Sequence, residues 1–430
     1  MPIWTPLISL LAAGTASTAV SSGGPEQCEA VDPKADLPCV VAQAFSPVTV
    51  TALMRDRDRV WWTNGDRLTV LGRLNERGEA RLCCAIQAPL KRIGDTQLGA
   101  ITLRIPRMDQ AMLDVVLLSG PVFEPPEPLR GIDAPPAPAV SEVPQARLFS
   151  RSVSSTALNG EREVTIYLPT GIGEGRRVPV IYLADGESAR GYAGIFEAAL
   201  AKGEVEPAMI VGIHSAKGVE PNCHAAHCDR RNLEYIPDSH GVDARHFTNH
   251  LRFVADELIP YIERRYPASR RREDRIVAGF SSGAVWAFSA AAIRSDVFGG
   301  VLGMSSGSGS TVSLASGIGN ARIYAGAGLF EPKFLDATSR RVELARAAGS
   351  EAEFTSHVSG HSSIMWDVLF HEGASWLLPS VEVRTARRSA SSPSDNVERP
   401  ATTSASLPSA YRPTSQKAVG QSRSFQPYER

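Results

Sequence analysis

The chain has 430 residues, of which 43% are hydrophobic and 21% are charged. This balance is typical of a globular protein and excludes a wholly disordered or collagen-like chain; the length predicts two domains, or three. The 45 Lys and Arg residues are offset by 46 Asp and Glu residues, so no overall basic field is available to hold nucleic acid. No apolar run reaches about 18 residues, so we expect no transmembrane helix.

Residues 1–22 have the features of a signal peptide. An apolar stretch around residues 7–11 precedes small residues at 16–19, as in the core and cleavage region of a leader. Only the α-amino group is positive, because no Lys or Arg precedes Lys34, and the frayed N-terminus of a cytosolic protein is the alternative. The leader predicts a periplasmic or secreted protein.

The six cysteines are even in number, which also favours an oxidising compartment. Cys28 and Cys39, and likewise Cys223 and Cys228, are close enough in sequence to close small loops. Two histidines lie between Cys223 and Cys228, so free thiols and a zinc site are alternatives there. Four zinc ligands are hard to arrange in so short a loop. We therefore predict a disulfide, with no metal and no cofactor.

Residues 25–120 are predicted to form a β-rich accessory domain. Short β-type runs are separated by turn sequences such as Asn64-Gly65-Asp66, the pattern of a small sandwich. The runs cover residues 48–53, 59–62, 68–71 and 101–105. The proline-rich residues 121–147 are predicted to be a stiff linker.

Residues 148–380 carry a different pattern, in which near-continuous apolar runs alternate with helical stretches. This pattern predicts an α/β domain with a mostly parallel sheet covered on both faces. Strands are expected at 164–168, 178–184, 209–213, 275–279, 301–304 and 323–325, and helices near 190–202, 244–264, 283–294 and 335–348. Residues 384–430 are rich in Ser, Arg, Pro and Thr and are predicted to be a disordered tail.

The sharpest motif is Gly279-Phe280-Ser281-Ser282-Gly283, between a predicted strand and a predicted helix. The two glycines permit a tight turn that lifts the Ser281 hydroxyl out of the sheet. The amide of Ser282 would then be one donor to an oxyanion. The alternative is a plain connection, because Gly and Ser are common in loops.

A nucleophilic serine needs a base, and in this fold class the acid and then the histidine follow it in the chain. His361 lies in a loop between a predicted strand and a predicted helix and is the predicted base. His357 lies within that strand and His371 within that helix, where core or surface roles are more common.

The acid is expected in the loop after the strand at 322–325. Glu331 lies in that loop and is preferred to Asp336, which belongs to the following helix. The second oxyanion donor is expected after the strand at 180–184, where a turn could present the Glu187 amide. An ordinary strand-to-helix turn is the alternative there.

Residues 148–378 resemble the putative esterase family of α/β-hydrolases, which includes esterase D, feruloyl esterases, mycolyltransferases and enterochelin esterase-like proteins. Several separate blocks match in the same order, which is more specific than one motif. The blocks are Val178–Gly186, Arg231–Pro237, Phe253–Glu263, Arg275–Gly283, Gly326–Glu331 and Gly360–Trp366. The preceding β-rich segment more loosely resembles the N-terminal sandwich of enterochelin esterase-like proteins.

The resemblance implies a triad of Ser281, Glu331 and His361, with the amides of Glu187 and Ser282 as the oxyanion hole. Some enterochelin esterase relatives resemble Ser–His dyads, in which case Glu331 would matter little. One departure is Ala284, where many members have a second glycine; alanine is small enough to keep the helix packed.

We therefore predict a serine carboxylester hydrolase that forms an acyl-enzyme on Ser281. Its substrate would be a small-molecule ester, siderophore-like or another envelope or extracellular ester. Acyl transfer at the same triad and a non-catalytic binding protein on this scaffold are the alternatives. Arg230 and Arg231 are predicted either to guide an anionic substrate or to form ion pairs with Asp229 and Glu234.

Overall fold

The computed structural model describes residues 28–30, 37–119, 126–220, 228–237, 244–308 and 318–380. These residues all belong to one compact unit of the chain, residues 1–384. The predicted signal peptide, the predicted disordered tail and Cys223 lie outside the described residues. None of the described helices is long and apolar enough to cross a membrane.

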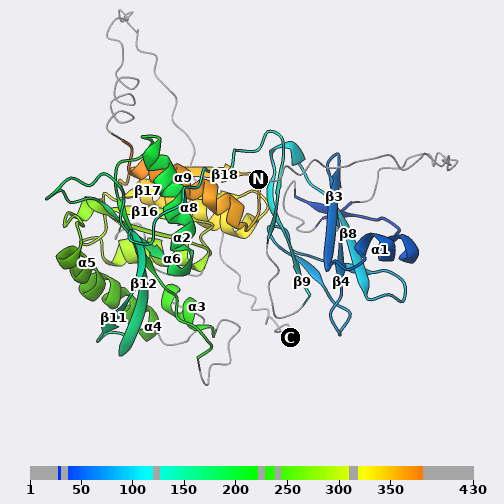
Figure 1. Cartoon of the computed structure of the whole chain (residues 1–430), viewed down its shortest axis with the longest axis horizontal. Coiled ribbons are helices and arrows are strands. Elements are labelled where there is room, and N and C mark those ends of the chain that lie inside the picture. The colour runs from blue at the N-terminus through cyan, green and yellow to red at the C-terminus, as the bar shows by residue number, and fades with distance from the viewer. Residues whose placement is uncertain are drawn as a thin grey trace, which may run out of the picture. The chain divides into compact units, whose positions relative to one another are not determined.

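The N-terminal region contains two antiparallel sheets, as the sandwich pattern predicts (Figure 1). The larger sheet has the order β1-β2-β8-β4-β3, with β7 paired to β8, and the smaller has the order β10-β9-β5-β6. The larger comprises β1 (Cys28–Ala30), β2 (Cys39–Val41), β3 (Arg59–Asn64), β4 (Arg67–Arg73), β7 (Lys91–Arg92) and β8 (Leu98–Arg104). The smaller comprises β5 (Arg81–Cys84), β6 (Ala88–Pro89), β9 (Met112–Leu118) and β10 (Glu127–Arg130).

Apolar side chains from both sheets pack into one core, which includes Val70, Leu103, Leu113 and Leu117. Strands of the two sheets contribute to it because alternate side chains of a half-buried strand point to the same face. The predicted all-β fold of this region is confirmed.

Two details of the N-terminal region differ from the sequence predictions. Residues 48–53 were expected to form a strand but belong to helix α1 (Pro47–Met54). Pro47 suits the first helical turn, and Val50 and Met54, four residues apart, bury the same face. The segment predicted as a linker contains β10, whose backbone pairs with β9.

The larger region is built on an eight-stranded sheet with the order β11-β12-β14-β13-β15-β16-β17-β18. Every neighbouring pair from β14 to β18 is parallel, whereas β11 and β12 join as antiparallel edge strands. The strands are β11 (Leu148–Ser155), β12 (Gly160–Tyr167), β13 (Val180–Ala184), β14 (Met209–Ile213), β15 (Arg275–Phe280), β16 (Gly300–Met304), β17 (Arg322–Gly328) and β18 (Ala352–His357).

Helices cover both faces of this sheet and form a separate core with each (Figure 1). One core includes side chains of α2 (Ala189–Ala201) and α9 (Ser363–Leu377). The other includes side chains of α3 (Arg230–Tyr235), α4 (Arg245–Arg252), η3 (Phe253–Leu258), α5 (Ile259–Arg265), α6 (Ser282–Ile293) and α8 (Pro332–Ala347). Short helical turns are η1 (Met108–Gln110), η2 (Gly186–Ser188) and η4 (Arg272–Asp274). The predicted α/β-hydrolase architecture is confirmed.

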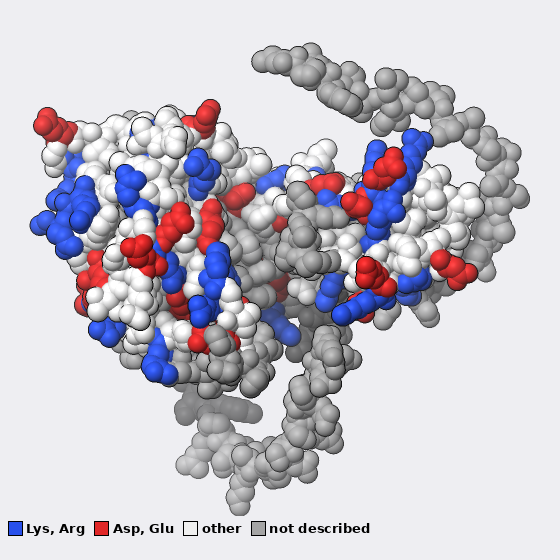
Figure 2. All heavy atoms as spheres, turned by 60° about the horizontal axis from the view of Figure 1, so that its bottom comes forward, with Lys and Arg blue, Asp and Glu red and all other residues white. Residues whose placement is uncertain are grey.

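Acidic and basic side chains are intermingled on the face of the molecule that Figure 2 shows. Lys and Arg do not gather there into one basic stripe. This distribution agrees with the formal net charge of −1.

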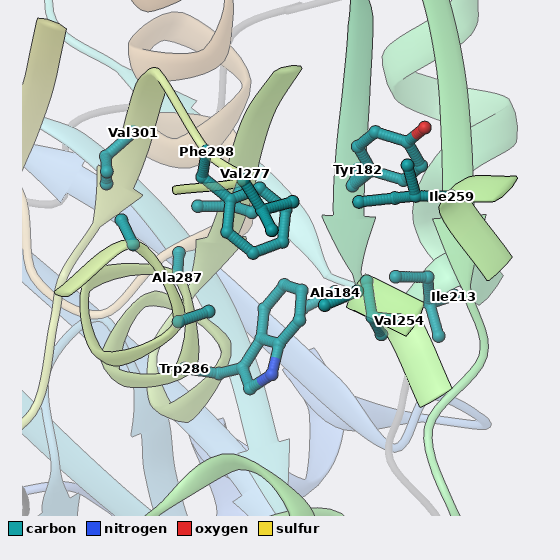
Figure 3. Close-up of a cluster of buried hydrophobic side chains, with 14 of the residues drawn as sticks. Tyr182, Ala184, Ile213, Val254, Ile259, Val277, Trp286, Ala287, Phe298 and Val301 are labelled. Atoms are coloured by element: carbon teal, nitrogen blue, oxygen red, sulfur yellow. The ribbon is translucent and has the colours of Figure 1, made fainter. Parts of the chain in front are cut away.

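Trp286 of α6 lies at the centre of one core and is 0% exposed. Its ring belongs to the same cluster as Ala184 of β13 and Val254 of η3 (Figure 3). The indole N–H has no hydrogen-bond partner among the described residues, so Trp286 contributes to the fold through its volume and its apolar surface.

Replacing Trp286 by Ala should lower the free energy of unfolding by about 3–5 kcal/mol, because it leaves a cavity in a packed core. Trp286→Phe should cost less than half as much, since no hydrogen bond is lost. Urea unfolding measures both. The control is Ile132→Ala, at a side chain 92% exposed, which should stay within about 0.5 kcal/mol of wild type. A loss below about 1 kcal/mol for Trp286→Ala would contradict the packing.

Candidate active site

Ser281 occupies a sharp turn between β15 and α6, with backbone angles φ 55° and ψ −126°. A positive φ is strained for a residue with a side chain. A Cβ on Gly279 would lie 2.5 Å from the backbone of Gly283, so the two ends of the turn approach too closely for any larger residue. The Ser281 amide donates to the carbonyl of Met304, at 2.9 Å, which ties the turn to β16.

The structure brings Ser281, His361 and Glu331 together, although 80 residues separate Ser281 from His361. The Ser281 Oγ lies 3.0 Å from His361 Nε2. The Glu331 Oε2 lies 2.6 Å from His361 Nδ1. When Nδ1 carries the proton and donates to the carboxylate, Nε2 is left as an acceptor for the serine hydroxyl.

The Glu331 carboxylate is held by two further donors. Its Oε1 accepts from the Ser305 Oγ at 2.5 Å and from the Gly328 amide at 2.7 Å. The Trp366 indole N–H donates to the Ser305 Oγ at 2.9 Å. Glu331 is 6% exposed, so these bonds orient a nearly buried carboxylate and leave Oε2 for His361. Nothing in the sequence marked Ser305, beyond its position just after a predicted strand.

The other candidates lie elsewhere. Asp336 is an exposed residue within α8. His357 is at the end of β18 and its Nε2 lies 3.1 Å from Glu372. His371 is in α9 and its Nε2 lies 2.8 Å from Glu204. Both histidines therefore have carboxylate partners outside the Ser281 site.

Glu187 lies in η2, directly after β13, and Ser282 is the first residue of α6. The η2 turn packs tightly, since a Cβ on Gly186 would lie 2.4 Å from the backbone of Gly212. Burial would raise the pKa of the Glu187 carboxyl. Hydrogen bonds from Lys217, from its own backbone and from Ser215 outweigh burial and hold that pKa below its usual range.

Arg231 links these two turns. Its guanidinium donates to both carboxylate oxygens of Asp185, at 2.5 and 2.7 Å, and also to the Ser282 Oγ. Burial raises the pKa of Asp185, although the Arg231 bonds lower it in part. Because Asp185 precedes η2 and Ser282 opens α6, one side chain holds the turns after β13 and β15 together.

Arg230 and Arg231 form ion pairs, but the predicted partners Asp229 and Glu234 are wrong. Glu234 pairs with Arg162, at 2.6 Å, which leaves Arg231 to Asp185. Arg230 pairs with Glu220 at 3.1 Å. Asp229 instead caps α3 by accepting from the Asn232 amide at 2.9 Å. Arg162 and Asp185 lie 72 and 46 residues from their partners, so local spacing did not indicate these two pairs.

A comparison of the sequence with known families identifies the family of this chain. The sequence model of the family described as "Putative esterase" matches residues 155–394. The chain belongs to this esterase family. It is therefore a carboxylic ester hydrolase, and the alternative of a non-catalytic binding protein is set aside.

Solved structures with the same fold include an enterochelin esterase and a ferric enterobactin esterase. Enterochelin esterase from Shigella flexneri is 16% identical, with a TM-score of 0.56, and the match covers 76% of this chain and 97% of that chain. Ferric enterobactin esterase from Salmonella typhimurium is 16% identical, also with a TM-score of 0.56, covering 76% of this chain and 98% of that one. These matches show a common fold.

A cavity of about 290 Å³ in this esterase is lined by Phe280, the residue before Ser281, and by Ser363, two residues after His361. Phe280 and Trp366, which line it, stack with ring centroids 4.5 Å apart. Asp367 also lines it. Burial raises the pKa of Asp367 to about 6; the nearby Asp114 adds to this rise, and Arg130 offsets it in part.

A larger cavity of about 720 Å³ is lined by residues of 61–66, 107–109 and 128–132 and contains none of the predicted site residues.

The cysteines are consistent with the predicted compartment. Cys28 is bonded to Cys39, which lies close to it in sequence, and Cys83 is bonded to Cys84. Cys228 is buried, and its predicted pairing with Cys223 stays a prediction because Cys223 is not among the described residues. Within the described ranges, no three His, Cys, Asp or Glu side chains are grouped closely enough to hold a metal ion.

Asp367→Asn should make the esterase more stable above pH 6. Because the folded-state pKa of about 6 exceeds the ordinary 3.8, ionisation costs stability as the pH rises between these values. The variant cannot ionise, so its advantage should reach about 1–2 kcal/mol at pH 8, discounted for partial exposure, and vanish near pH 4. Urea unfolding at both pH values tests this. A larger advantage at pH 4 than at pH 8 would contradict it.

Proposed function

We propose that this esterase cleaves its substrate through an acyl-enzyme on Ser281, with His361 as general base and Glu331 as its orienting acid. One observation carries the proposal: the unbroken chain of contacts from Ser281 Oγ to His361 at 3.0 Å and from His361 to Glu331 at 2.6 Å. A serine hydroxyl is a weak nucleophile, and a positioned imidazole acceptor activates it.

In the first half-reaction, Ser281 Oγ attacks the ester carbonyl carbon while its proton moves to His361 Nε2. The imidazolium is stabilised by the Glu331 carboxylate and returns the proton to the leaving alcohol as the C–O bond breaks. In the second, water gives its proton to Nε2, attacks the acyl carbon and releases the acid, and Ser281 regains its proton. Acyl transfer follows the same course when an alcohol replaces water.

The amides of Glu187 and Ser282 are the proposed oxyanion donors. Such donors stabilise the tetrahedral intermediate best when they are held rigidly before reaction. The Arg231 bridge between Asp185 and Ser282 supports this assignment, because it restrains both turns at once. The positive end of α6 adds to the field at Ser281.

We propose a siderophore-like ester, or another envelope or extracellular ester, as the substrate. The support is the fold shared with the enterochelin and ferric enterobactin esterases. The aromatic walls of the 290 Å³ cavity suit an organic acyl or alcohol group. A periplasmic or secreted location is proposed from the leader pattern and the two disulfides.

Ser281→Ala should reduce kcat for p-nitrophenyl acetate by about 10⁴- to 10⁶-fold, because the covalent route is lost while the oxyanion donors remain.

A fluorophosphonate should label wild type once, at Ser281, and should not label His361→Ala. Peptide mapping identifies the labelled serine. Ser306→Ala is the matched control and should be labelled like wild type. An adduct on Ser282, Ser305 or Ser306 would reject Ser281 as the nucleophile.

Glu331→Gln distinguishes a triad from a Ser–His dyad. In a triad the amide favours the wrong imidazole tautomer, and kcat should fall by about 10³- to 10⁴-fold. In a dyad the fall should stay below about tenfold. The control is Asp336→Asn, on the exposed face of α8, which should leave kcat unchanged. The readout is p-nitrophenyl acetate turnover at saturating substrate.

A further inference from the structure

Helix α9 begins two residues after His361, but its own N-cap residue does not cap it. Ser362 is the N-cap and makes no side-chain cap bond within the helix. The carboxylate of Asp114, on β9 of the N-terminal region, takes this role instead. Its Oδ2 accepts from the Ser363 amide at 2.8 Å, from the Ser363 Oγ at 3.0 Å and from the Ser362 Oγ at 2.9 Å.

A carboxylate is well suited to this position. The first amides of a helix lack partners within it, and the positive end of the helix dipole attracts a negative charge. Asp114 is 7% exposed, so its bonds to the helix are protected from water and weakly screened. The cap therefore comes from a residue 249 positions away in the sequence.

The segment before His361 is fastened to the same strand. The Met112 amide donates to the Val358 carbonyl at 2.9 Å, and the buried Ser359 hydroxyl donates to the Met112 carbonyl. Gly360 lies directly against the N-terminal region, since a Cβ there would be 1.6 Å from the Ala85 carbonyl oxygen. The loop is thus attached to the N-terminal region on both sides of His361.

We propose that Asp114 is a positioning residue for His361, through which the N-terminal β-rich region holds the catalytic loop in register with Ser281. The proposal rests on the proposed function of His361 as the base. The N-terminal region then supplies the cap that fixes where α9 starts.

Loss of this cap has a predictable kinetic signature. A freed first turn of α9 lets the imidazole move away from Ser281 Oγ, and misplacement by about 1 Å can cost about 100-fold in rate. The oxyanion turns keep their own contacts. Ser363, Trp366 and Asp367 of α9 line the substrate cavity, but the short acyl group of p-nitrophenyl acetate needs little of that cavity, so binding of this ester should change little. The effect should therefore be on kcat and not on KM.

The test uses the full-length chain with p-nitrophenyl acetate and a fluorophosphonate. Asp114→Ala should lower kcat by about 10- to 100-fold with KM within about twofold. The fluorophosphonate labelling rate should fall in parallel, since labelling needs Ser281 and His361 but little of the substrate cavity. Asp114→Asn keeps an acceptor oxygen and is a good N-cap residue, so it should recover kcat to within about threefold of wild type.

Two further variants keep the test decisive. Asp95→Asn, at an exposed site of the same region, should match wild type throughout. If Asp114→Ala does not fold, as judged by circular dichroism, Ser362→Ala removes one of the three bonds from the α9 side and should lower kcat at least threefold.

Several outcomes would overturn the proposal. They are wild-type kcat and labelling in folded Asp114→Ala, a lower melting temperature with unchanged kcat, a change confined to KM, and wild-type kcat in Ser362→Ala when Asp114→Ala does not fold. His361→Ala separates the two levels of inference. If it stays active, the proposed base is wrong, whereas an inactive His361→Ala beside a wild-type-like Asp114→Ala rejects only the positioning role.

Discussion

The turn at Ser281 is the constraint on which the arrangement of the site depends. A serine at φ 55° would relax if it were free, but here β15 pairs with β13 and β16 on either side. The hydrogen bond from the Ser281 amide to the Met304 carbonyl and the close contact between Gly279 and Gly283 hold the turn in this strained conformation. The hydroxyl is thereby held where β15 ends.

The other groups of the site follow the same strand ends. Asp185 follows β13, Ser305 follows β16, and Glu331 lies in the loop after β17. Neighbouring parallel strands place their carboxyl ends at one edge of the sheet. Hydrogen bonds between successive loops then fix the side chains, as in the bond from Ser305 to Glu331.

Two ion pairs near Ser281 join different elements of this esterase. The Arg231–Asp185 pair joins α3 to the end of β13. The Arg162–Glu234 pair joins β12 to α3. A buried ion pair contributes little net stability, because desolvation offsets the attraction. What such pairs provide here is a defined geometry for short segments around Ser281.

Local patterns predicted much of this structure. Near-continuous apolar runs marked the central parallel strands, because both faces of those strands are buried. The turn at Ser281 was predictable from its two glycines, and the location of His361 and Glu331 in loops was predictable from the strand and helix patterns that flank them. The prediction of a strand at residues 48–53 was wrong. The β-branched residues there favour a strand locally, whereas Pro47 and the packing of Val50 and Met54 favour a helix.

The sequence by itself determined the fold class and the strand-to-helix turn at Ser281, because the fold class follows from the periodicity of apolar residues and the turn follows from local glycines. Only the tertiary structure decided that Arg231 pairs with Asp185 and that Asp114 caps the helix after His361. Those contacts join residues far apart in the chain. The residues next to a charged side chain in the sequence do not indicate its partner, because the packing of the sheets decides which segments become neighbours.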